Sequence, residues 1–192
     1  MEYSPYAGLN KSEWEDKTKE LIDAHPLKEN FIKKTVLDSW ECILKTSIGK
    51  YKIGIDIFPK PQIMGFFLHE LICLEISHFD PETWACEKKI SDKDIVNLKN
   101  SHHSIEIKTS SNKTKIFGNK SYAQNTNKSK KIKTGYYVAV NFEKYTPTKI
   151  APKILNVRFG WLDRDDWKGQ KAQSGQQARL DVDVEKYKLL NI

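Results

Sequence analysis

The sequence predicts a fold of the α/β (α+β) class, with a central mixed β-sheet flanked by helices. Two observations lead to this prediction. Between residues 12 and 45, apolar side chains recur at the spacing of amphipathic helices. Beyond them, alternating or continuous apolar runs typical of strands occupy 50–58, 94–98, 104–110, 135–142 and 153–161.

The 192 residues are expected to form one domain (1–192), since this length suits a single hydrophobic core. Its parts are N-terminal helices (12–45), a core of about 50–160 that carries the chemistry, and a polar loop (160–180). No apolar run approaches the roughly 20 residues of a membrane span. The N-terminus lacks the basic and apolar regions of a signal peptide, so we expect a cytoplasmic protein with no membrane partner.

The first helix is predicted from Ser12 and Glu15, which have the spacing of a capping box. Pro26 interrupts this helix, and a second apolar stripe runs from Leu27 to Leu44. We expect both helices to pack against the core or at a subunit interface, and we assign them no chemistry.

Residues 65–76 are strongly apolar but carry charges. His69-Glu70-x-x-Cys73 is half of a zinc-protease helix motif, and it is rejected because the second histidine is missing. A carboxylate inside an apolar helix is usually paired or bound to metal, so Glu70 is a candidate metal ligand, with Glu75 as the substitute.

The most informative stretch is 104–110. Side chains alternate on a strand, so Ile105 and Ile107 face one way while Glu106 and Lys108 face the other. A hairpin with residues 94–98 would bring Asp94 beside Glu106. Two carboxylates and a lysine at the end of a hairpin suit a magnesium-dependent phosphodiesterase. The alternative is an exposed charge pair on a sheet face.

The net charge of +7 favours a polyanionic partner. Between residues 113 and 133 the chain has seven lysines and no acidic residue. Asn119 or Ser121 would cap a helix through Tyr122, whose N-terminus would receive a phosphate. The anion-binding candidates in this segment are Lys113, Lys115, Asn119, Lys120 and Ser121.

The segment 168–179 is polar and surrounds two glycines. Arginine and lysine bridge guanine, and glutamine bridges adenine, in the major groove. The candidate base-reading residues are Lys168, Gln170, Lys171, Gln173, Gln176, Gln177 and Arg179. The alternative is an ordinary surface loop.

The three cysteines, Cys42, Cys73 and Cys86, are odd in number and form no Cys-x-x-Cys pair. Neither a disulfide framework nor a zinc site is indicated. Their apolar surroundings predict three buried thiols.

Asp94 followed by Glu106-Ile107-Lys108 resembles the PD-(D/E)xK nuclease core. Longer strings resemble type II restriction endonucleases of the ScaI type, from about residue 53 to 190. These strings are Ser104-Ile105-Glu106-Ile107-Lys108-Thr109-Ser110-Ser111, Ile116-Phe117-Gly118-Asn119-Lys120-Ser121-Tyr122-Ala123-Gln124 and Phe159-Gly160-Trp161-Leu162.

The resemblance implies a restriction-endonuclease-like core in which Asp94, Glu106 and Lys108 are catalytic. Asp94, Glu106 and the Ile107 carbonyl would bind Mg²⁺, or Mn²⁺ in its place. Lys93 stands where the motif has proline, which leaves Asp92 as a rival to Asp94.

The resemblance also implies a homodimer on double-stranded DNA that cuts a short palindrome, AGTACT to blunt ends, and a cognate DNA methyltransferase. The alternatives are a repair or structure-specific nuclease of the same core, and a non-catalytic basic DNA-binding protein.

Overall fold

The computed structural model describes residues 3–123, 132–146, 151–169 and 176–192, and its centre is a six-stranded sheet. The strand order is β11-β8-β7-β5-β4-β3. Strands β5 and β7 pair in parallel and the other neighbours are antiparallel, so the sheet is mixed as predicted. The strands are β3 (Trp84–Cys86), β4 (Ile95–Asn97), β5 (Ile105–Ser110), β7 (Gly135–Phe142), β8 (Ile154–Leu162) and β11 (Leu189–Asn191).

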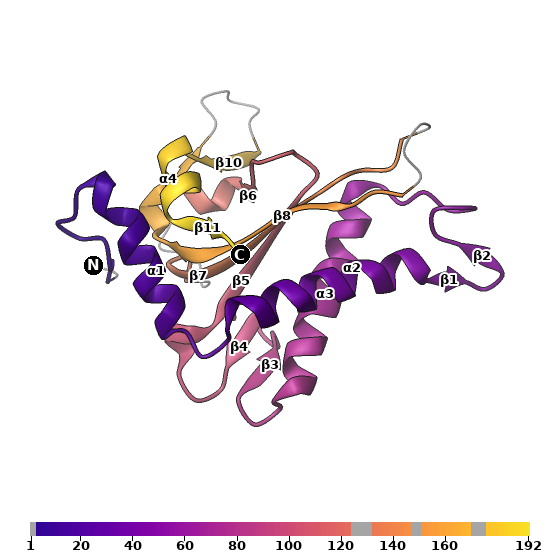
Figure 1. Ribbon diagram of the computed structural model, residues 1–192, viewed down its shortest axis with the longest axis horizontal. Coiled ribbons are helices and arrows are strands. Elements are labelled where there is room, and N and C mark those ends of the chain that lie inside the picture. The colour runs from indigo at the N-terminus through magenta and orange to yellow at the C-terminus, as the bar shows by residue number, and fades with distance from the viewer. Residues whose placement is uncertain (1–2, 124–131, 147–150, 170–175) are drawn as a thin grey trace.

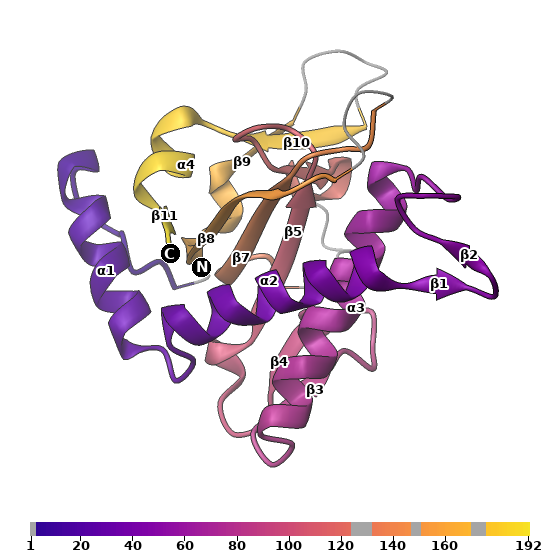
Figure 2. The ribbon, with the colours of Figure 1, turned by 45° about the vertical axis from the view of Figure 1, so that its right-hand side comes forward.

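Helices cover one face of this sheet, and Figure 2 shows α2 running across the strands with α3 beside it. These helices are α1 (Trp14–Ala24), α2 (Glu29–Lys45) and α3 (Pro61–Phe79). Ile105 and Ile107 from β5 and Val138 from β7 are buried in the core that the helices form. The predicted helical region and the buried face of 104–110 are confirmed.

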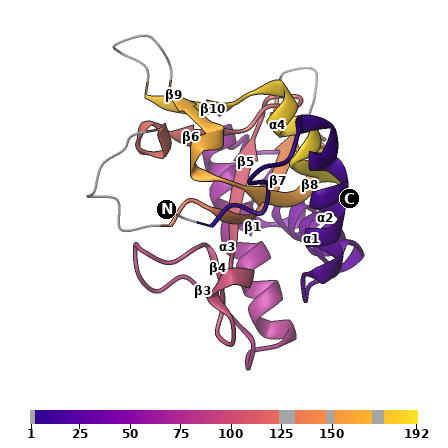
Figure 3. The same cartoon turned by 90° about the vertical axis from the view of Figure 1, so that its left-hand side faces the viewer.

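A smaller layer covers the opposite face. It consists of a second sheet in the order β6-β10-β9, the 3-10 turn η3 and helix α4. Figure 3 shows this small sheet over the upper part of β5 and β7. Tyr137 and Ala139, the alternate residues of β7, are buried here in a separate apolar cluster. The elements are β6 (Phe117–Asn119), η3 (Lys120–Ala123), β9 (Trp167–Gly169), β10 (Gln177–Leu180) and α4 (Val182–Tyr187).

The predicted strands at 135–142 and 153–161 match β7 and β8. Every residue of β7 is buried, as expected for a strand with neighbours on both sides. The predicted capping box of Ser12 and Glu15 is wrong, because Asn10 and Glu13 form a capping box on a short 3-10 turn, η1 (Lys11–Glu13), that leads directly into α1. The Glu13 carboxylate accepts the Asn10 backbone N–H at 2.8 Å.

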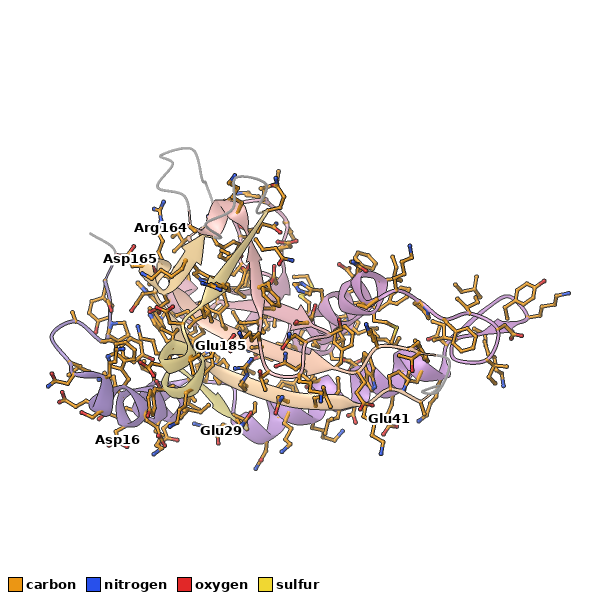
Figure 4. All side chains as sticks on the ribbon, turned by 90° about the horizontal axis from the view of Figure 1, so that it is seen from above. Asp16, Glu29, Glu41, Arg164, Asp165 and Glu185 are labelled. Carbon is orange, nitrogen blue, oxygen red and sulfur yellow. A yellow bond between two sulfur atoms is a disulfide. The ribbon has the colours of Figure 1, made fainter. Side chains whose placement is uncertain are left out.

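The expected strand at 50–58 is wrong. Residues 47–52 form a small hairpin of β1 (Ser47–Ile48) and β2 (Tyr51–Lys52), outside the central sheet. Gly54 then turns the chain with φ +83, a conformation that L side chains rarely adopt. The hairpin extends beyond the body as an arm (Figure 1), and Figure 4 shows the same arm from above, past the end of α2 marked by Glu41.

The polar connector expected at 80–91 contains an edge strand, β3. Cys86 on β3 forms a disulfide with Cys73 on α3, with a Cα–Cα distance of 5.5 Å. Cys42 is exposed. The prediction of three buried thiols is therefore wrong, because sequence spacing does not show that α3 packs directly against β3.

Within the described ranges, no helix combines the length and apolar character that spanning a bilayer requires.

Candidate active site

The β4–β5 hairpin brings Asp94 to Glu106. Ile95 pairs with Ile105 in antiparallel register, so Asp94 and Glu106 lie opposite each other one position further along. Asp94 Oδ2 accepts the backbone N–H of Ile107 at 2.6 Å. This hydrogen bond fixes the Asp94 carboxylate against β5, where the hairpin prediction expected it.

Glu106 is 2% exposed, on the face of β5 that the smaller layer covers. A buried carboxylate needs charged or hydrogen-bonding partners. Glu106 Oε1 accepts Lys108 Nζ at 2.6 Å and the Tyr122 hydroxyl at 2.5 Å. The Glu106–Lys108 pair is thus not the solvent-exposed pair of the alternative interpretation.

Besides Glu106, the Lys108 ammonium group is close to a backbone carbonyl and an aromatic ring. Its Nζ is 3.2 Å from the Ile107 carbonyl oxygen and 4.8 Å from the centre of the Tyr122 ring. Burial and the nearby Glu106 charge raise the pKa of Tyr122 far above its usual value, so the phenol stays protonated and donates to Glu106.

Asp94, Glu106 and Lys108 open into a pocket of about 1070 Å³. His69 from α3, together with Asn119, Ser121 and Tyr122 from β6 and η3, also lines it. A second pocket of about 690 Å³ shares His69, Phe117 and Asn119 with the first, and Gln177 of β10 lines it too. The two pockets therefore form one continuous depression beside β5.

The candidate metal ligands converge here only in part. Asp94, Glu106 and the Ile107 carbonyl are adjacent, but Glu70 is exposed and lines neither pocket. Its substitute, Glu75, is exposed as well. Buried Leu68 and Ile72 define the inner side of α3, and the helical period turns Glu70 away from it.

Asp92, the alternative to Asp94 as first metal ligand, makes backbone hydrogen bonds instead. Its carboxylate accepts the backbone N–H groups of Lys88 and Lys89 at 3.2 and 3.0 Å and stabilises a turn. It does not line the pocket that holds Glu106.

Three of the anion-binding and base-reading candidates line the depression, namely Asn119, Ser121 and Gln177. Lys113 and Lys115 are exposed on a loop whose backbone carbonyls accept Asn156 and Asn141 side chains. Lys120 is half-buried in η3. The helix expected through Tyr122 is a four-residue 3-10 turn, Lys120–Ala123, in the described part of that segment.

The expected base-reading loop is bounded by two paired strands, β9 and β10. Lys168 and Arg179 are cross-strand partners and both are exposed, whereas Trp167 and Ala178 are buried. Gln176 is exposed and its carbonyl accepts the Lys120 backbone N–H at 2.8 Å. Gln170, Lys171 and Gln173 lie outside the described residues.

Sequence reasoning missed several residues of the pocket. His69 Nδ1 is 3.7 Å from Asp94 Oδ2, and its signal was present in the rejected His69-Glu70 motif. Lys133 and Tyr122 line the pocket as well, although the sequence indicates only a basic segment for Lys133 and a helix for Tyr122. Glu87 and Lys89 also line the pocket.

The donor set fits a hard divalent cation. Among the described residues, no group of three or more His, Cys, Asp or Glu side chains has metal-binding geometry. The site offers the carboxylates of Asp94 and Glu106 and the Ile107 carbonyl. Mg²⁺ characteristically binds one or two carboxylates and keeps several waters beside a substrate phosphate. The residues present therefore suit Mg²⁺ better than a closed structural metal site.

A mixed central sheet flanked by helices, with acidic residues and a lysine at one hairpin, defines the restriction-endonuclease-like class. The sequence model of the ScaI restriction endonuclease family matches residues 4–192. The curated protein "Type II restriction enzyme ScaI" of Streptomyces caespitosus is 45% identical over 193 residues, covering 98% of this chain and 84% of that protein. The chain belongs to the ScaI restriction endonuclease family and is a type II restriction endonuclease, which confirms the resemblance seen in its sequence.

Proposed function

We propose that this chain hydrolyses phosphodiester bonds of double-stranded DNA in a Mg²⁺-dependent reaction, with Asp94, Glu106 and Lys108 as catalytic residues. One observation carries the proposal. Asp94 is fixed on the Ile107 N–H, directly opposite a buried Glu106 that is bonded to Lys108, and all three open into one pocket.

Asp94, Glu106 and the Ile107 carbonyl would hold the Mg²⁺, with Mn²⁺ as a substitute. When bound, the ion supplies a more acidic water and neutralises charge on the phosphate. Lys108 Nζ lies 2.6 Å from Glu106, where an ammonium orients the attacking water or stabilises the charge that develops on the phosphate. A lone acid or base provides only about 10²–10⁴-fold acceleration, which is too little for this reaction.

We propose that one set of residues contacts the DNA backbone and that a second set reads the bases. Lys113, Lys115 and Lys120, with Asn119 and Ser121, would contact the DNA backbone, since phosphate contacts position a duplex without reading it. The strands β9 and β10 and their connection would read bases, through Lys168, Gln176, Gln177 and Arg179, and through Gln170, Lys171 and Gln173 outside the described residues.

The 45% identity to ScaI supports a finer proposal. The enzyme is a cytoplasmic homodimer that cuts AGTACT to blunt ends, and a cognate methyltransferase protects the host DNA. A palindrome and a two-fold symmetric dimer match each other, because each protomer then cuts one strand.

The test is incubation of the purified chain with a long defined DNA and Mg²⁺, followed by sequencing of the ends. Discrete fragments that end within one palindrome support the proposal. A smear, or cutting only at branched structures, would indicate a repair or structure-specific nuclease instead.

Two variants test the site itself. Glu106→Ala and Lys108→Ala should each lower cleavage by about 10³-fold or more, because several kcal/mol of transition-state stabilisation is lost. Duplex binding in Ca²⁺ should remain. Glu41→Ala is the control, since Glu41 is exposed on α2 and forms an ion pair with Lys45 at 2.9 Å, one turn away on the same helix. Normal magnesium-dependent cutting by Glu106→Ala would refute the assignment, and tight binding without nicking by the wild type would favour a non-catalytic DNA-binding protein.

A further inference from the structure

Tyr122 reaches the catalytic centre from a separate sheet. It lies in η3, directly after β6, and its hydroxyl donates to Glu106 Oε1 at 2.5 Å. Lys108, on β5 itself, donates to the same oxygen at 2.6 Å. Glu106 therefore receives one donor from its own strand and one from a different layer of the fold.

The Tyr122 ring is held from several sides. The Trp167 ring lies 4.9 Å away in an edge-to-face arrangement. A Cβ at Gly118 would lie 2.9 Å from Tyr122 Cγ, so the glycine leaves just enough room for the ring. Lys108 Nζ and Lys133 Nζ each lie 4.8 Å from the ring centre. These contacts leave the hydroxyl little freedom to move away from Glu106.

A carboxylate that binds a cation must present its oxygens in a defined orientation. Residues that hydrogen-bond to a metal ligand restrict its rotation, and their loss typically lowers metal affinity or activity by about 10–100-fold. The Glu106 side chain has rotatable bonds of its own, so burial alone does not fix the plane of the carboxylate. The Tyr122 hydroxyl supplies this restraint.

We propose that Tyr122 is a positioning residue that holds the Glu106 carboxylate in the orientation required to bind the divalent cation. The proposal rests on the proposed function, in which Glu106 is a metal ligand. In this proposal Tyr122 acts through Glu106, to which its hydroxyl is hydrogen-bonded.

The test uses Tyr122→Phe, which removes one oxygen and keeps the ring. Mn²⁺ binding to the DNA-free protein is measured from the electron paramagnetic resonance signal of free Mn²⁺. We expect binding about 10–100-fold weaker than wild type, and a similar rise in the Mg²⁺ concentration for half-maximal cleavage. The KM for duplex DNA should stay unchanged, since the hydroxyl is engaged by Glu106.

Tyr136→Phe is the matched control. Tyr136 is also buried, and its hydroxyl donates to the Leu21 carbonyl at 2.9 Å on the opposite face of the sheet. It should lose a comparable amount of stability while keeping wild-type Mn²⁺ affinity. Replacing Tyr122 with 4-aminophenylalanine restores a donor, so this variant should regain most of the affinity even if Tyr122→Phe is unstable.

The outcomes separate the two proposals. Wild-type Mn²⁺ affinity in a folded Tyr122→Phe protein, with no binding by Glu106→Ala, would overturn the role of Tyr122 and leave the metal site standing. Equal loss in Tyr122→Phe and the 4-aminophenylalanine variant would also overturn it, because a donor would then not be what matters. Wild-type Mn²⁺ binding and cleavage by Glu106→Ala would instead overturn the proposed function.

Discussion

His25 makes the stability of this enzyme depend on pH. Its side chain is fully buried between Tyr136 and Phe159, with ring centres 4.5 and 5.0 Å away. Nε2 lies 3.0 Å from the His103 carbonyl oxygen, and Nδ1 accepts the Leu27 backbone N–H at 3.2 Å. A neutral imidazole with its proton on Nε2 satisfies both contacts. A second proton on Nδ1 would lose the Leu27 N–H contact and would have the Leu27 carbonyl oxygen, 3.3 Å away, as its acceptor.

Burial lowers the pKa of His25 from 6.5 to about 4, with a further small contribution from the neighbouring His103 and Lys28 charges. The unfolded chain binds a proton below pH 6.5, but the folded protein binds it only near pH 4. Stability therefore falls as the pH drops between these values, and one pKa unit corresponds to 1.36 kcal/mol. The loss amounts to about 3 kcal/mol, a large part of the stability of an ordinary domain.

The assay is urea unfolding at several pH values between 7 and 4, for wild type and for His25→Gln. The variant cannot titrate at this position, so the difference in unfolding free energy between the two proteins should change by about 3 kcal/mol across this range. His102→Gln is the control, since His102 is exposed on the neighbouring turn. Burial also lowers the pKa of His103, so its contribution to the pH dependence has the same sign as that of His25 and remains in the His25→Gln variant. Parallel pH profiles for wild type and His25→Gln would refute the reasoning.

Two further predictions concern packing and base reading. Gly160→Ala should destabilise the protein by about 1–3 kcal/mol or more, because its Cβ would lie 2.0 Å from the carbonyl oxygen of Lys188, the residue just before β11. Thermal melting checks this against Gly169→Ala, where the nearest atom is the Ala123 methyl group at 3.3 Å and the loss should be small; equal melting temperatures would contradict it. Gln177→Ala should relax discrimination by about 1–3 kcal/mol at one base pair, measured as cleavage of the proposed site against single-base variants. An unchanged ratio of rates would exclude Gln177 as a base-reading residue.

The parts of the fold that the sequence predicted are those with a strong local pattern. β7 is apolar nearly throughout and β5 alternates, so both strands and the helices of residues 12–45 follow from side-chain periodicity. The hairpin placed Asp94 opposite Glu106 because register follows from which residues must be buried. Residues 50–58 alternate as well, but Gly54 and the Asp56 carboxylate, which accepts the Lys52 N–H, form a turn instead.

The elements and contacts that the sequence did not predict depend on tertiary packing. β9, β10 and α4 are short, and they form because residues such as Trp167 and Leu180 pack together in one apolar cluster rather than because of local preference. A charge in an apolar run makes Glu70 a candidate ligand, yet the helical period points His69, and not Glu70, toward the pocket. Tyr122 lies in a polar segment without periodicity, so its contact with Glu106 becomes visible only once β6 is placed beside β5.

The position of Glu106 in the middle of the main sheet affects how the enzyme loses activity on heating. β5 pairs with β7 along its length and with β4 at Ile105, and a layer packs on each face, so we expect the amide of the buried Glu106 to exchange with solvent only when the sheet opens. Partial opening of the chain ends or of the β1–β2 arm leaves the carboxylate in place. Inactivation by heat should therefore coincide with global melting, and a partly unfolded enzyme that still binds DNA but has lost its acidic centre should not accumulate.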